Sequence, residues 1–142
     1  MRVTLESRSR TLLALLAAGV LAAGAAHAGN AELALTGGQE VPPVTTQAAG
    51  SGAITINDDH SVEGTITTTG VDGTMAHIHH APAGKNGPVI VPLEKKGASQ
   101  WTVPAGARLT DEQYQAFKNG QLYVNVHSAA HPGGEIRAQM KP

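Results

Sequence analysis

One β-prone segment contains three histidines within four consecutive positions. Residues 75–87 read MAHIHHAPAGKNG and contain His77, His79 and His80. Alternate side chains of a β-strand point to the same face, so His77 and His79 share one face and His80 lies on the other. The Cα atoms of His77 and His79 would be roughly 6.6 Å apart, which lets both imidazoles tilt towards one metal ion.

A third imidazole is available from a second predicted strand. Residues 121–127 read QLYVNVH, and alternation places His127 on its polar face together with Tyr123 and Asn125. His131, in the following loop, is a fourth candidate that would cap the site or act as an outer ligand. Imidazole suits Cu(II) and Zn(II), and at a nitrogen-only site the affinity order peaks at Cu(II). We therefore predict a site for Cu(II), or less favourably Zn(II), formed by His77, His79 and His127.

A second interpretation gives the histidines no ligand. Histidines near loop ends are commonly solvated, or they bond to backbone carbonyls without binding a metal. His80, on the opposite face, and His60, in a polar turn, are expected to be surface residues. Met75 shares the face of His77 and His79, but a methionine at the start of a strand is more often core filler.

Composition argues against several other functions. The chain has no cysteine, so no disulfide or thiolate is available, and metal ligands are limited to His, carboxylate, Met and backbone oxygen. No serine lies in a nucleophile-elbow motif and no glycine-rich phosphate loop is present, so we predict no catalytic residue.

Trp101 and Tyr123 are expected to be packing or rim residues. Glu135 and Arg137 share one strand face, which predicts an exposed ion pair worth less than about 1 kcal/mol.

The first 28 residues have the pattern of a secretory signal peptide. Arg2, Arg8 and Arg10 precede an apolar run over residues 12–26, and Ala26-His27-Ala28 fits a small-x-small cleavage site. A run of about 15 residues is shorter than the roughly 20 that cross a bilayer, so no membrane anchor is expected. The mature chain, 29–142, is predicted to be periplasmic or secreted.

The mature chain is expected to be mildly acidic. Cleavage removes three of the ten Lys and Arg residues and one of the eleven Asp and Glu residues, leaving seven against ten, a net charge of −3. The remaining basic residues are scattered along the sequence. Nucleic acid is therefore not an expected partner, because the phosphate backbone requires a concentrated basic surface.

Short β-prone runs and turn signals predict one all-β domain over 29–142. Residues 31–35, 52–56 and 61–69 alternate or are rich in β-branched residues, and the polar stretch 57–60 predicts a hairpin turn. Residues 121–127 and 135–140 predict a second hairpin. Thr110 and Gln113 form a capping box that predicts one helix over 111–118, ended by Asn119-Gly120. This pattern indicates an antiparallel β-sandwich or flattened barrel with one short helix.

Three segments resemble one known family, the CHRD domain. They are AHIHHAPAGKNGPVIVPL (76–93), LYVNVHSAAHPGGEIRAQM (122–140) and ALTGGQEVPPVTTQAAGSGAITI (34–56). This module is named for its repeats in chordin and also occurs singly in exported bacterial proteins. Chordin sequesters an extracellular growth factor, so the resemblance implies an alternative function as a non-catalytic module that binds another exported protein without metal.

The domain is also similar in outline to Cu/Zn superoxide dismutase, a Greek-key-like all-β fold in which an H-x-H strand and distant histidines hold copper. In this comparison His77, His79 and His127 take the matching places. The chain lacks that enzyme's cysteine pair, bridging histidine and zinc-binding aspartate, so dismutase activity is not expected. The first hypothesis is therefore an exported protein that binds copper or zinc for storage, buffering or delivery.

Overall fold

The structure, a computed structural model, describes residues 27–142 as nine antiparallel strands with two short helices. The strands are β1 (His27–Thr36), β2 (Ala49–Asn57), β3 (Val62–Thr69), β4 (Gly73–His80), β5 (Val89–Pro92), β6 (Glu94–Lys96), β7 (Gln100–Thr102), β8 (Leu122–Ser128) and β9 (Ile136–Met140). The helices are the 3-10 turn η1 (Gly37–Gln39) and α1 (Asp111–Lys118). The predicted signal peptide lies outside the described residues except for its last two positions.

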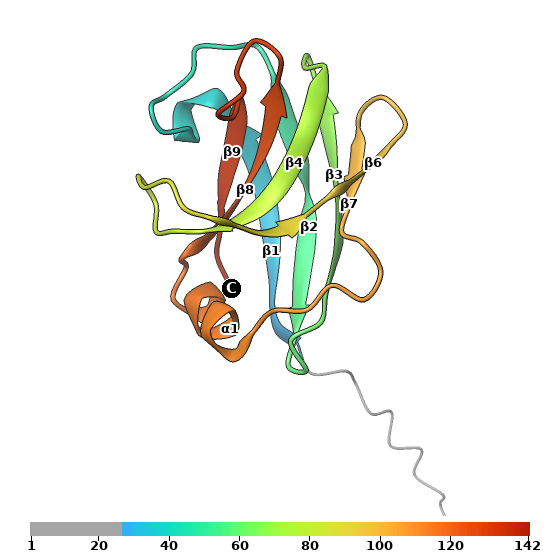
Figure 1. Cartoon of the computed structure of the whole chain (residues 1–142), viewed down its shortest axis with the longest axis vertical. Helices are drawn as coiled ribbons and strands as arrows, with labels where there is room; N and C mark the ends of the chain where they lie inside the picture. The colour runs from blue at the N-terminus through green and yellow to red at the C-terminus, as the bar shows by residue number, and fades with distance from the viewer. Residues whose placement is uncertain (1–26) are drawn as a thin grey trace, which may run out of the picture.

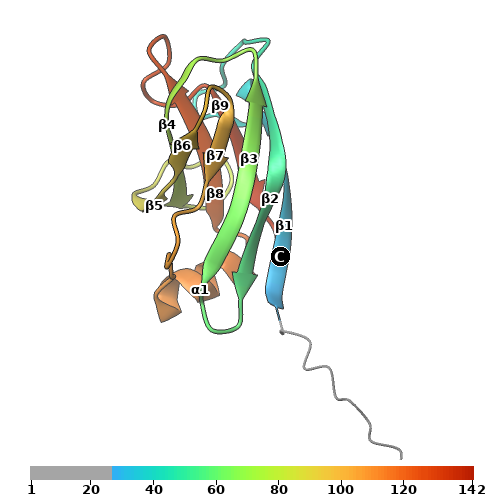
Figure 2. The ribbon, with the colours of Figure 1, turned by 90° about the vertical axis from the view of Figure 1, so that its right-hand side faces the viewer.

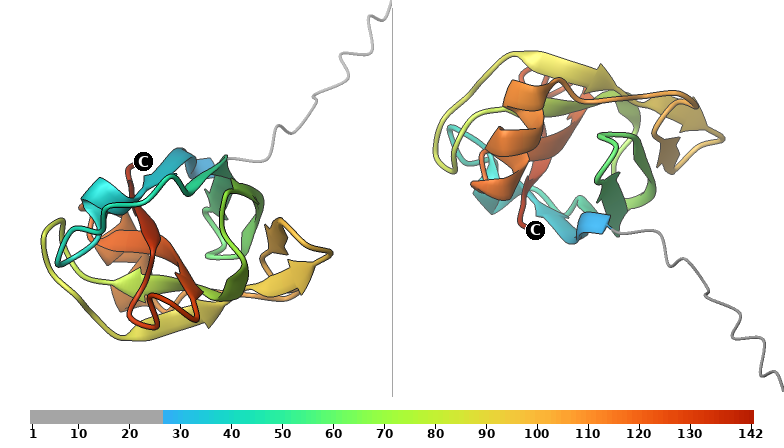
Figure 3. Two further views of the ribbon diagram at one scale, coloured as in Figure 1. Left: turned by 90° about the horizontal axis from the view of Figure 1, so that it is seen from above. Right: turned by 90° about the horizontal axis from the view of Figure 1, so that it is seen from below.

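The strands form two layers of a flattened barrel. Their order is β5-β4-β8-β9-β1-β2-β3-β7-β6, and β1 meets β9 through a single residue pair, Thr36 with Arg137. At the opposite side, β5 and β6 are separated only by Leu93, whose N–H bonds to the carbonyl of Ala76. One continuous segment therefore pairs with β4 and then with β7, and it nearly closes the barrel (Figures 1 and 3). The predicted fold class is confirmed.

Local sequence signals account for the elements that the sequence predicted. The β2–β3 hairpin turns at residues 57–61, where His60 adopts a positive φ of 70°. The side chain of Thr110 accepts a hydrogen bond from the N–H of Gln113, and the Gln113 side chain accepts one from the N–H of Thr110. This capping box starts α1 at Asp111, and the helix covers one end of the barrel (Figure 1).

The apolar core lies between the two layers, which Figure 2 shows edge-on. Alternation directs one side of each strand inward, including Ile54 and Ile66 from one layer and Ile78, Val124 and Ile136 from the other. All five of these side chains are fully buried. His77 and His79 of β4 and His127 of β8 alternate with core positions, so they lie on the outer face of their layer.

Two loops cover this outer face and overturn one prediction. Residues 37–48 and 81–88 lie over β8 and β9, and Arg137 is only 1% exposed. Its guanidinium lies 3.4 Å from the centroid of the Tyr123 ring and donates to the carbonyl of Lys85. Glu135 accepts a hydrogen bond from the hydroxyl of Thr46 at 2.6 Å. The predicted exposed Glu135–Arg137 ion pair is therefore wrong, because the covering loops bury both residues and supply other partners.

Candidate metal centre

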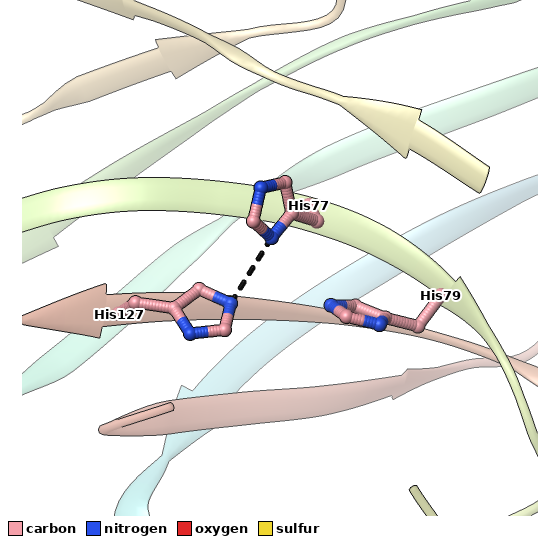
Figure 4. Close-up of side chains that lie close together, drawn as sticks. All are labelled: His77, His79 and His127. Atoms are coloured by element: carbon pink, nitrogen blue, oxygen red, sulfur yellow. Dashed lines mark hydrogen bonds between the residues drawn. The ribbon is translucent and has the colours of Figure 1, made fainter. Parts of the chain in front are cut away.

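The three predicted histidines converge on the outer face of two paired strands. In the β4–β8 register, His77 lies opposite Asn125 and His79 lies opposite Tyr123, so His127 is diagonal to His77. The ring centroids are 4.9 Å apart for His77 and His127, 5.5 Å for His77 and His79, and 6.1 Å for His79 and His127. Figure 4 shows the three rings pointing towards one another.

Backbone carbonyls fix the orientation of two of the rings. His79 Nδ1 lies 2.9 Å from the carbonyl oxygen of Gly87, and His127 Nδ1 lies 2.9 Å from that of Pro132. A carbonyl only accepts, so both Nδ1 atoms carry the proton and both Nε2 atoms keep a lone pair when the rings are neutral. His79 Nε2 is buried, with the Asn125 side chain beside this ring, and His127 Nε2 lies 3.1 Å from His77 Nδ1. Two nitrogen lone pairs are thus directed into the cluster.

Neighbouring side chains and one loop fix the position of the His79 ring. Tyr123 stacks on His79 with centroids 4.7 Å apart and an interplanar angle of 2°, and Arg137 covers the other face of Tyr123. Gly87 accepts from His79 through its carbonyl and donates its N–H to the Tyr123 hydroxyl at 3.2 Å. Such outer partners orient metal-binding imidazoles and set their tautomer.

Burial favours the neutral form of His77 and His79. Burial lowers the pKa of His77, and the nearby rings of His127 and His79 lower it further, because positive charges would repel one another. Burial also lowers the pKa of His79, although its hydrogen bond to Gly87 opposes this shift. Neutral imidazole is the ligating form, so both rings remain available to a metal at more acidic pH than a free histidine.

The geometry fits an ion that prefers imidazole. One ligand atom from each histidine lies within 4.8 Å of the others. Two nitrogen atoms that bind the same ion through bonds of about 2.0–2.1 Å can be at most about 4 Å apart. The 3.1 Å contact between His77 and His127 meets this limit, and the widest separation has to shorten before all three atoms can bind one ion. No carboxylate of residues 27–142 joins the group. Three imidazole nitrogens suit Cu(II) or Zn(II).

The other sequence candidates lie apart from these three rings. His131 is not among the grouped residues, and its side chain acts electrostatically on Glu135. His60 is half-buried and stacks on Tyr114, 4.2 Å between centroids, while His80 is half-buried at the end of β4. The sequence interpretation missed the orienting roles of Gly87, Pro132 and Tyr123. Only the role of Tyr123 had a sequence signal, because alternation places Tyr123 on the same strand face as His127.

Comparison with known families agrees with the resemblance that the histidine motifs carry. Among residues 27–142, no helix has the length and apolar character needed to cross a membrane. Neither a curated protein nor a solved structure gave a match. The CHRD domain matches residues 31–140, a span that contains β2 to β9, both helices and all three clustered histidines. The chain therefore belongs to the CHRD domain family.

Proposed function

We propose that this CHRD-domain protein binds a transition metal outside the cytoplasm, with Cu(II) preferred and Zn(II) second, through His77, His79 and His127. Its role would be storage, buffering or delivery of the ion rather than catalysis. The observation that carries this proposal is the convergence of the three imidazoles, whose ligand atoms lie within 4.8 Å of one another.

Export is part of the proposal and rests on the sequence. The basic start, the apolar run over residues 12–26 and the Ala-His-Ala site favour cleavage near Ala28 and release into the periplasm or the medium. A copper- or zinc-binding protein in that location would meet ions that enter from outside the cell. The absence of cysteine is compatible with this location, because no thiol is available for oxidation.

The alternative is an interaction module in which the histidines only hold loops. The two carbonyl contacts favour it, because His79 to Gly87 and His127 to Pro132 would fix the loops after β4 and β8 without any metal. On this alternative, another exported protein is the partner. Replacing His77 would then leave recovery of that partner unchanged.

Electron paramagnetic resonance during a Cu(II) titration tests the metal site. The wild-type protein is expected to bind one ion with a nitrogen-rich spectrum, and His77→Ala is expected to lose that signal. His77 is the sharpest position, because substitution of His79 or His127 also removes a hydrogen bond to a loop carbonyl. His80→Ala, on the opposite face of β4, is the matched control. Equal Cu(II) binding by wild type, His77→Ala and the triple alanine variant of the three histidines would refute the site.

A further inference from the structure

A methionine lies on the same strand face as the histidine cluster. Met75 precedes His77 by two residues in β4, and its register partner in β8 is His127. Opposed residues of an antiparallel pair have Cβ atoms about 5 Å apart, and residues two positions apart along a strand share one face. Met75 is therefore a direct neighbour of two of the three proposed ligands.

The side chain of Met75 is not part of the core. It is 48% exposed, whereas Met140 in β9 is completely buried. The expectation that Met75 is core filler is thus wrong. Among the described residues, the other large hydrophobic side chain with comparable exposure is Val89, which pairs with His79 from the edge strand β5. An unbranched thioether with three rotatable bonds is free to turn towards the cluster from this position.

Chemistry distinguishes Met75 from the imidazoles. Three histidines leave one position open at a four-coordinate ion. A thioether is a soft, uncharged donor that suits Cu(I), whereas the usual protein ligands of Zn(II) are Cys, His and Asp or Glu. The chain has no cysteine, so methionine is its only source of a soft sulfur ligand. Of the two methionines among the described residues, Met75 is exposed and Met140 is buried.

We propose that Met75 supplies a thioether as a fourth ligand, which allows the site to hold Cu(I) and makes it selective for copper over zinc. This inference rests on the proposed function, because the three histidines must first form the metal site. The partly exposed His77 and Met75 would then be the solvent-facing ligands past which the ion enters, while His79 and His127 are buried.

Competition against a chromogenic Cu(I) chelator without oxygen tests this proposal, with a parallel Zn(II) titration. Met75→Leu keeps the apolar volume at an exposed position and removes only the sulfur, so folding is preserved. Cu(I) affinity is expected to fall at least about tenfold, a loss that even outer partners of metal ligands produce, while Zn(II) affinity stays unchanged. Val89→Leu, on the neighbouring strand, is the matched control and should retain both affinities.

The outcomes separate the two proposals. If Met75→Leu binds Cu(I) as tightly as wild type while His77→Ala does not, the thioether ligand is refuted and the histidine site stands. Equal losses of Cu(I) and Zn(II) affinity in Met75→Leu would also refute it, since selectivity would not depend on sulfur. If the wild type binds neither Cu(I), Cu(II) nor Zn(II), both proposals fall. Sulfur scattering in copper X-ray absorption, absent from Met75→Leu, would support direct ligation.

Discussion

The three imidazoles are not equivalent at the scale of single residues. His79 and His127 are each 7% exposed and donate from Nδ1 to backbone carbonyls, so their rings have little freedom. His77 is half-buried, and its hydrogen bond goes to His127. An incoming ion would replace the hydrogen bond between His77 and His127, because the lone pair of His127 Nε2 can accept either the His77 proton or the metal ion, but not both. Two rings are thus preset, and the third has to adjust.

The lowered pKa values of His77 and His79 make the stability of the metal-free protein depend on pH. Both lie below 6.5, the value for unperturbed histidine, so the unfolded chain takes up protons first as the medium is acidified. The free energy of unfolding should therefore decrease as the pH falls from about 6.5 through the lowered values of the folded state. Urea denaturation at about pH 7.5 and about pH 5.5 measures the change.

His77→Ala is the control for this pH dependence. Burial raises the pKa of Glu40, despite the opposing charge of Arg137, so protonation of that carboxyl on acidification stabilises the folded protein and opposes the effect of the histidines. The contribution of Glu40 is common to both proteins and cancels in their difference. The wild type should lose more stability than His77→Ala between the two pH values. An identical loss would show that this imidazole does not carry the effect.

At the scale of elements, the loop between β4 and β5 connects the site to β9. Arg137 donates to the Lys85 carbonyl and to Asn86, and Asn86 donates to the Val41 carbonyl at 2.8 Å. Near the end of this loop, Gly87 forms hydrogen bonds with His79 and Tyr123. Position 87 has no room for a side chain, because a Cβ there would lie 2.0 Å from the carbonyl oxygen of His80.

Gly87→Ala should therefore displace the loop and weaken the site. We expect a loss of about 1–3 kcal/mol in the free energy of unfolding, typical of overpacking. We also expect Cu(II) affinity to fall about 10–100-fold, since His79 loses its carbonyl partner. Gly133→Ala is the matched control, because a Cβ at that loop position meets nothing within 4 Å. Chemical denaturation and Cu(II) titration measure both effects, and equal behaviour of the two variants would contradict this role of the loop.

The sequence was most informative where the signals are local. The capping box of Thr110 and Gln113 fixed α1 at residues 111–118, and alternation put His77, His79 and His127 on their correct faces. Alternation identifies two faces of a strand but not which of them a distant loop covers. Arg137 therefore suggested a surface charge, although residues 81–88 bury it. The contacts of Gly87 and Pro132 with the rings likewise depend on loop paths that no short-range pattern encodes.

The whole molecule separates its core from its candidate site. The apolar side chains lie between the layers, while the three histidines occupy the outer face of the β5-β4-β8-β9 layer. Loss of the site therefore need not unfold the barrel. Binding would nevertheless connect β4 and β8 through ligands that the unfolded chain does not hold together. Metal binding and stability should then be linked for the whole fold.

This linkage predicts that Cu(II) raises the melting temperature of the wild-type protein. An ion that binds only the folded state adds about 2.7 kcal/mol at a free concentration 100 times its dissociation constant. For a domain of this size, that corresponds to a rise of roughly 5–15 °C. His77→Ala should melt near the wild-type temperature without metal and gain little from Cu(II), because its core is intact and its site is incomplete. Differential scanning calorimetry with and without a chelator measures the shift, and an equal rise in both proteins would place copper elsewhere on the chain.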